Sequence, residues 1–90
     1  MQVTHVRIEG RVQGVFFRDF TRSQAMQLNL TGWVRNRRDG SVESVIAGRE
    51  KDISLLLDRL RQGSPGSRVD NVAVSHLESD ETFTTFEVRY

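Results

Sequence analysis

The chain has 90 residues, 37% of them hydrophobic and 28% charged, a balance typical of a globular domain rather than a disordered or collagen-like chain. It contains no cysteine, which excludes a disulfide framework, a thiolate metal site and a cysteine nucleophile. The formal net charge of +1 is too small for a strongly basic nucleic-acid surface. We therefore expect residues 1–90 to form a single domain.

Hydrophobic periodicity predicts seven elements in the order strand, helix, strand, strand, helix, strand, strand. Near the N-terminus, Val6 and Ile8 alternate with polar side chains, as in a half-buried strand. Further along, Phe17, Thr21 and Ala25 fall on one stripe of a helix. The predicted strands are residues 3–10, 31–38, 41–48, 69–78 and 82–90, and the predicted helices are residues 17–30 and 49–62.

Turn signals separate these elements. Asp39-Gly40 is typical of a two-residue hairpin loop, and Gly63-Ser64-Pro65-Gly66 breaks the chain after the second helix. With right-handed crossovers, the order predicts an α+β fold of the ferredoxin-like class, a split β-α-β sandwich with two helices on one face of a mostly antiparallel sheet. In this fold the first strand lies beside the third, and the second strand follows. The fold hosts enzymes and binding modules alike, so it does not identify a function.

The connection between the first strand and the first helix contains a candidate anion site. Residues 10–18 read GRVQGVFFR, so two glycines flank a short loop that directly precedes a helix. Such a loop can turn consecutive backbone N–H groups inward, and the helix N-terminus adds a positive dipole end. Arg18 is unfavourable in a first turn unless an anion binds there. The alternative is that Gly10 and Gly14 only permit a tight turn and Arg18 points to solvent.

A second stretch, GWVRNRRDGSVE at residues 32–43, favours the anion site over a simple tight turn. Together with GRVQGVFFR it makes the whole chain resemble the acylphosphatase family, small enzymes that hydrolyse the mixed anhydride of a carboxylate and phosphate. The segments 63–65, 68–70 and 86–90 resemble the family as well. Asn29 stands where many members have a glycine that ends the helix, and asparagine tolerates the left-handed conformation needed there.

The resemblance implies roles for particular residues. Arg18 ends the first signature and would bind the phosphate, and Asn36 of the second signature would position the attacking water. The backbone amides of Gln13, Gly14, Val15, Phe16 and Phe17 would form the phosphate cradle. We expect a cytoplasmic, monomeric enzyme without metal or cofactor, which acts on a small-molecule acyl phosphate and is inhibited competitively by inorganic phosphate or sulfate. We expect no nucleic-acid partner, because the net charge is only +1. We expect no membrane partner, because no apolar run has membrane-spanning length.

Two other functions fit the fold. An RNA-binding module of this topology displays aromatic residues on its third strand, but residues 41–48 read SVESVIAG and contain none. A domain of a carbamoyl-phosphate maturation enzyme is the second alternative, and such enzymes are long multidomain chains.

The remaining candidate residues have structural interpretations. His5 and His76 lie in predicted strands without a carboxylate or second histidine at ligand spacing, so we expect structural or solvent-facing roles. Asp19 in a first turn complements the helix dipole. Three arginines near Trp33 are consistent with nucleic acid, but a solvated hairpin rim is the better interpretation. They are Arg35, Arg37 and Arg38.

Overall fold

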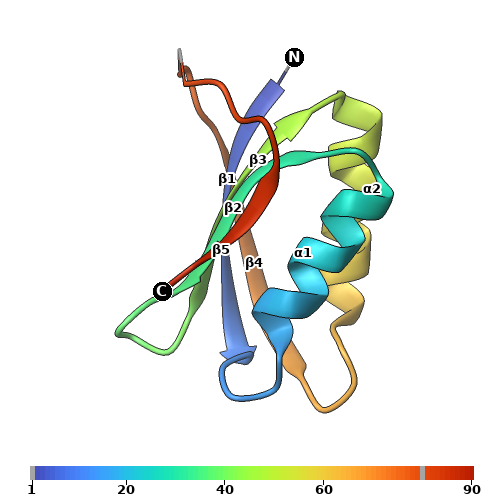
Figure 1. The fold of residues 1–90 in the computed structure, drawn as a ribbon. Coiled ribbons are helices and arrows are strands. Elements are labelled where there is room, and N and C mark those ends of the chain that lie inside the picture. Colours follow the sequence, from blue (N-terminus) through green and yellow to red (C-terminus); the bar gives the residue numbers. More distant parts are fainter. Residues whose placement is uncertain (1, 80) are drawn as a thin grey trace.

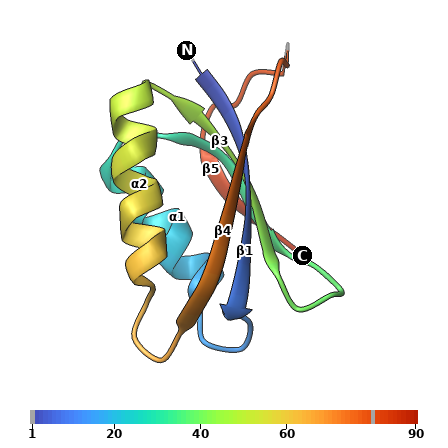
Figure 2. The same cartoon turned by 180° about the vertical axis from the view of Figure 1, so that it is seen from behind.

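A computed structural model describes residues 2–79 and 81–90, which form one five-stranded sheet with two helices on the same face (Figures 1 and 2). The predicted ferredoxin-like α+β fold is confirmed. The elements are β1 (Gln2–Arg11), α1 (Phe17–Gln27), β2 (Thr31–Asn36), β3 (Val42–Gly48), α2 (Glu50–Gln62), β4 (Arg68–His76) and β5 (Phe86–Arg89).

The strands lie in the order β4-β1-β3-β2-β5, so β3 has β1 on one side and β2 on the other, as expected. Both neighbours run antiparallel to β3, and only the β2–β5 pair is parallel. Val42 pairs with Ile8 of β1 and with Asn36 of β2. The loop after β1 and the β2–β3 hairpin therefore meet at the same end of the sheet, which is the lower end in Figure 1.

The core lies between the sheet and the helices. The alternating side chains of β1 and the helical stripes meet there, and burial of a large apolar side chain contributes about 1.5–3 kcal/mol. The last strand is shorter than the predicted residues 82–90, because β5 spans Phe86–Arg89, and Tyr90, the next residue, is 99% exposed. The most deeply buried apolar residues are Val6, Ile8, Val12, Phe17, Ala25, Val34, Val42, Ile46, Leu56, Leu60 and Phe86.

Two connections show how local backbone geometry ends the elements. Helix α1 stops before the predicted residue 30, because Asn29 takes the expected left-handed conformation with φ 56°. The Leu30 N–H then donates to the Ala25 carbonyl and the Asn29 N–H to the Met26 carbonyl, which closes the helix end as a Schellman motif.

The prediction of a two-residue hairpin loop is wrong. The Arg37 N–H donates to the Ser41 carbonyl at 2.8 Å, so the loop between this pair holds three residues, 38–40. Gly40 has φ 92°, and a left-handed last residue after a turn lets a three-residue loop match the twist of the strands.

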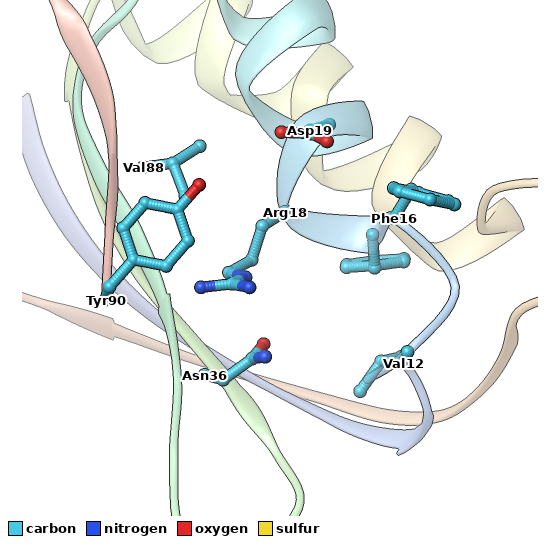
Figure 3. Close-up of a pocket in the computed structure, with 9 residues that line it drawn as sticks. Val12, Phe16, Arg18, Asp19, Asn36, Val88 and Tyr90 are labelled. Carbon is cyan, nitrogen blue, oxygen red and sulfur yellow. The ribbon is translucent and has the colours of Figure 1, made fainter.

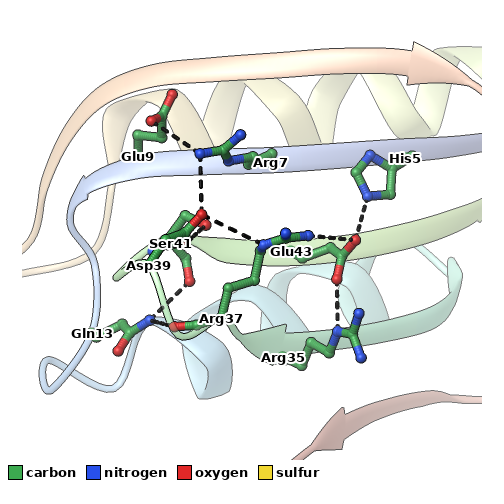
Figure 4. Close-up of polar contacts among 9 residues, drawn as sticks. All are labelled: His5, Arg7, Glu9, Gln13, Arg35, Arg37, Asp39, Ser41 and Glu43. Atoms are coloured by element: carbon green, nitrogen blue, oxygen red, sulfur yellow. Dashed lines mark hydrogen bonds and ion pairs between the residues drawn. The ribbon is translucent and has the colours of Figure 1, made fainter.

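A buried carboxylate joins three strands on the face of the sheet that the helices leave open (Figure 4). Glu43 accepts hydrogen bonds from Arg35 Nε at 2.6 Å and pairs with His5 Nε2 at 2.6 Å and Arg37 Nη1 at 3.3 Å. Its side chain is only 9% exposed. Burial raises the pKa of Glu43, but the hydrogen bonds from His5 and Arg35 and their charges outweigh burial, and the pKa lies below its ordinary value.

His5 thus has a structural role, as expected, and it has a carboxylate partner that its sequence spacing did not indicate. The partner is on β3, and strand pairing rather than sequence spacing brings the two side chains together.

We predict that Glu43→Gln lowers the free energy of unfolding by about 1–3 kcal/mol at pH 7, because it leaves clustered cations without their shared carboxylate. Since folding lowers the pKa of Glu43, its contribution is present above the unfolded-state pKa and disappears as the pH falls through the folded-state pKa. Urea unfolding at pH 7 and pH 3 should show the two proteins converging in acid. Glu78→Gln, at an exposed position, is the control, and an equal deficit at both pH values contradicts the assignment.

Candidate active site

The loop that leaves β1 depends on close backbone packing at Gly10, the penultimate residue of the strand. The β1–β4 register shifts between Glu9 and Gly10, where φ is 133°. A Cβ atom on Gly10 would overlap the backbone carbonyl of Arg68 on β4. Gly10 therefore has a packing function as well as a conformational one, whereas Gly14, with φ 74° and open space around it, has only the second.

Phe16 directly precedes α1 in an unusual conformation. Its φ of 58° is left-handed, which costs a non-glycine residue about 1–2 kcal/mol, and its side chain is 82% exposed. A left-handed residue followed by a right-handed one forms a concave array of N–H groups that binds anions. No side chain caps the helix N-terminus. Nothing in the sequence indicated strain here, because a phenylalanine, unlike glycine or asparagine, is not expected to adopt positive φ.

A cavity of about 300 Å³ lies where the loop, α1 and the end of β2 meet (Figure 3). Five residues of the predicted site line it, namely Gly14, Phe16, Phe17, Arg18 and Asn36. The other lining residues are Val12, Asp19, Val88 and Tyr90. The predicted cradle residues Gln13 and Val15 are not among them. Val88 and Tyr90 were not expected in the site, because the sequence placed them only in the predicted strand 82–90.

The guanidinium of Arg18 contacts a backbone carbonyl and an aromatic ring near the C-terminus. Its Nη1 donates to the Arg89 carbonyl at 3.2 Å, and its guanidinium carbon lies 4.6 Å from the centre of the Tyr90 ring. Within the part of the chain that the structure describes, Arg18 forms no ion pair with a carboxylate. Its other N–H donors remain available to a ligand.

Asn36 ends β2 at the border of the same cavity. Its amide oxygen Oδ1 is buried and accepts no hydrogen bond from any residue in 2–79 or 81–90. An unpaired buried carbonyl costs about 1–3 kcal/mol. Figure 3 shows the amide of Asn36 and the guanidinium of Arg18 pointing towards the same space. The site thus holds an unused acceptor beside a cation with free donors.

The side chain of Gln13 connects the loop to the hairpin (Figure 4). Its Nε2 donates to the Arg37 carbonyl at 2.8 Å and to the Ser41 carbonyl at 2.9 Å. Arg37 directly follows Asn36, so these bonds tie the two signature segments together. The sequence analysis assigned Gln13 only a backbone role, because the side-chain contact exists only once the two loops converge.

The model of the acylphosphatase family matches residues 4–88. The chain belongs to the acylphosphatase family. An acylphosphatase from Rhizobium etli is 50% identical over 80 residues, which cover 87% of this chain and 85% of the relative. The crystal structure of acylphosphatase from Bacillus subtilis superposes with a TM-score of 0.96 at 37% identity, with 100% of both chains covered. The protein is therefore an acylphosphatase, an enzyme that hydrolyses acyl phosphates, which decides against the RNA-binding alternative.

A similar domain occurs within a larger protein. Full-length HypF matches with a TM-score of 0.83 and 32% identity over 99% of this chain, which corresponds to 12% of the HypF chain. Among residues 2–79 and 81–90, no helix is long and apolar enough to cross a membrane.

We predict that Gln13→Met lowers the free energy of unfolding by about 1–2 kcal/mol, because it keeps the side-chain length but removes both hydrogen bonds to the hairpin. Amide hydrogen exchange of residues 37–41 should become faster, because the hairpin loses its tie to the loop. Gln62→Met on the exposed end of α2 is the matched control. Unchanged exchange in the hairpin would show that the link contributes nothing to its order.

Proposed function

We propose that this acylphosphatase binds the phosphoryl group of its substrate with Arg18 and the loop amides, and attacks it with a water held by Asn36. The buried, unpaired Oδ1 of Asn36 beside the guanidinium carries the proposal. A bound water that donates one O–H to this oxygen would satisfy it and have a lone pair free for attack.

The proposed cradle consists of the backbone amides of residues 13–17, that is, Gln13, Gly14, Val15, Phe16 and Phe17. Two features support it: positive φ at Gly14 and Phe16, and the uncapped N-terminus of α1. A phosphate there accepts hydrogen bonds from N–H groups that otherwise face only solvent, and it benefits from the positive end of the helix dipole. The binding of an anion also offsets the strain at Phe16.

Arg18 has the position expected of a phosphate ligand. A cation in the first turn of a helix opposes the helix dipole, and this cost is offset when an anion binds between them. The guanidinium offers two parallel donors to the phosphoryl oxygens, on which negative charge develops in the transition state. Its hydrogen bond to the Arg89 carbonyl orients the group before substrate arrives.

The chemistry of acyl phosphates explains why so few groups suffice. The leaving carboxylate has an ordinary pKa of about 4, so it departs without a general acid. Phosphoryl transfer passes through a loose transition state, in which positioning and charge stabilisation dominate. The water oxygen forms a bond to phosphorus as the bond between phosphorus and the acyl oxygen breaks. The acyl group leaves as a carboxylate, and a phosphate oxygen takes the proton of the water.

We predict different kinetic effects for the two catalytic residues. Arg18→Ala should weaken phosphate binding and lower kcat, because the guanidinium contacts a phosphate that is charged throughout the reaction. Asn36→Ala should bind phosphate nearly as well as the wild type while kcat falls by about a hundredfold or more, the scale of one lost transition-state hydrogen bond. Calorimetry with phosphate and steady-state turnover measure both effects.

Two substitutions serve as matched controls. Arg22 lies one turn further along α1 and also donates to a β5 carbonyl, and Asn71 is an exposed asparagine of β4. Arg22→Ala and Asn71→Ala should leave turnover close to wild type. If Asn36→Ala keeps full turnover, or loses phosphate binding as severely as Arg18→Ala, the proposed division of roles is wrong.

We also predict that inorganic phosphate or sulfate inhibits competitively, since either anion occupies the cradle in place of the substrate phosphoryl group. A chelator should leave turnover intact, because in the proposed mechanism Arg18 and the amides neutralise the phosphoryl charge. Initial rates with acetyl phosphate at several phosphate concentrations, with and without chelator, test both points. Noncompetitive inhibition, or activity restored by a divalent ion after chelation, would exclude this arrangement.

A further inference from the structure

We propose that a surface hollow beside the active-site cavity binds a second anionic group on the acyl part of the substrate. The preferred substrates are then acyl phosphates whose acyl chain ends in a carboxylate. This inference rests on the proposed function, because it requires the phosphoryl group to lie between Arg18 and Asn36.

The hollow adjoins the cavity directly. It has a volume of about 600 Å³ and shares Asn36 and Tyr90 with the cavity. Its other lining residues are Arg35, Arg37, Arg38 and Asp39. An acyl chain that leaves a phosphoryl group near Asn36 thus has a path from the cavity into the hollow.

The end of β5 creates this hollow. Arg89, the last residue of β5, pairs with Arg35 of β2. The β2–β3 hairpin continues beyond this point, so its residues 36–39 have no strand beside them on that side. Figure 1 shows the hairpin projecting past the C-terminus. Because β5 does not continue along this part of the hairpin, arginine side chains next to the site stay exposed.

The charges in the hollow are unequal. Arg35 and Arg37 pair with Glu43, at 2.6 and 3.3 Å, and Asp39 pairs with Arg37 and Arg7. Arg38 is exposed and has no hydrogen bond or ion pair with any residue that the structure describes. Among the side chains that line the hollow, three are guanidinium groups and one is a carboxylate, and the guanidinium of Arg38 has no partner among the described residues. A carboxylate is the natural partner of a free guanidinium, which binds it through two donors.

This assignment replaces the view of the arginine cluster as a solvated rim of the hairpin. Arg35 and Arg37 do have a structural role, because Glu43 holds them on the open face of the sheet. Arg38 has no such partner among the described residues, and it lines the hollow together with Asn36. The net charge of +1 does not favour a nucleic acid as the ligand, and the hollow, at about 600 Å³, has room for a small acyl group.

The test compares two substrates that differ in one terminal group. Adipoyl monophosphate ends in a carboxylate and hexanoyl phosphate in a methyl group, while both have six acyl carbons. We expect Arg38→Gln to lower kcat/KM for adipoyl monophosphate by about fivefold, the upper range for an exposed ion pair, with hexanoyl phosphate unchanged. Arg38→Glu should lower the ratio of kcat/KM for adipoyl monophosphate to kcat/KM for hexanoyl phosphate further. The wild-type preference should fall as the ionic strength rises from about 10 mM to about 1 M.

Lys51→Gln is the matched control, since it removes one positive charge from the exposed side of α2 and leaves the hollow intact. The proposal is overturned if Arg38→Gln and Arg38→Glu leave the ratio unchanged, or if Lys51→Gln shifts it equally, which would indicate only long-range attraction. Hydrolysis of hexanoyl phosphate by the wild type, and its loss in Asn36→Ala, report separately on the proposed function. If that hydrolysis does not depend on Asn36, the mechanism fails whatever the ratio.

Discussion

The pairing of β3 with both β1 and β2 is the constraint on which the active site depends. Val42 faces Ile8 on one side and Asn36 on the other, so the ends of β1 and β2 are held at one level of the sheet. The proposed phosphate loop follows the first strand and the hairpin follows the second. A slip of one residue in the β2–β3 pairing would turn Asn36 away from the cavity, because successive strand side chains point to opposite faces.

Two contacts outside the cavity reinforce this register. On the open face, Glu43 pairs with His5 of β1 and Arg35 of β2, and its side chain is only 9% exposed. At the end of the sheet, Gln13 connects the loop to the carbonyls that flank the hairpin turn. The contacts of Glu43 join the strands, and those of Gln13 join the loop to the hairpin. Together they fix the distance between the two signature segments with groups that lie outside the cavity.

The site itself contains several locally unfavourable features. Phe16 is left-handed and exposed, Arg18 opposes the dipole of its helix, and Asn36 buries an acceptor without a partner. Each is costly in the free protein, and in the proposed mechanism each is offset by an anion or a water at the same place. Unfavourable local choices that one ligand resolves together are typical of functional sites rather than of folding errors. Our proposal for the arginine-lined hollow extends this logic to the acyl end of the substrate.

The sequence by itself determined the fold class, the order of the elements and the two segments that contain the candidate site residues. Its apolar periods are regular, and each signature is one continuous segment, so the family resemblance was enough to single out Arg18 and Asn36 as candidates. Other features were decided by tertiary structure. The partner of His5, the side-chain role of Gln13, the three-residue hairpin loop and the hollow beyond β5 all depend on which strands lie together and where each one ends. Those contacts join residues far apart in the chain, and no local spacing records them, because only burial and strand register bring such groups within hydrogen-bonding distance.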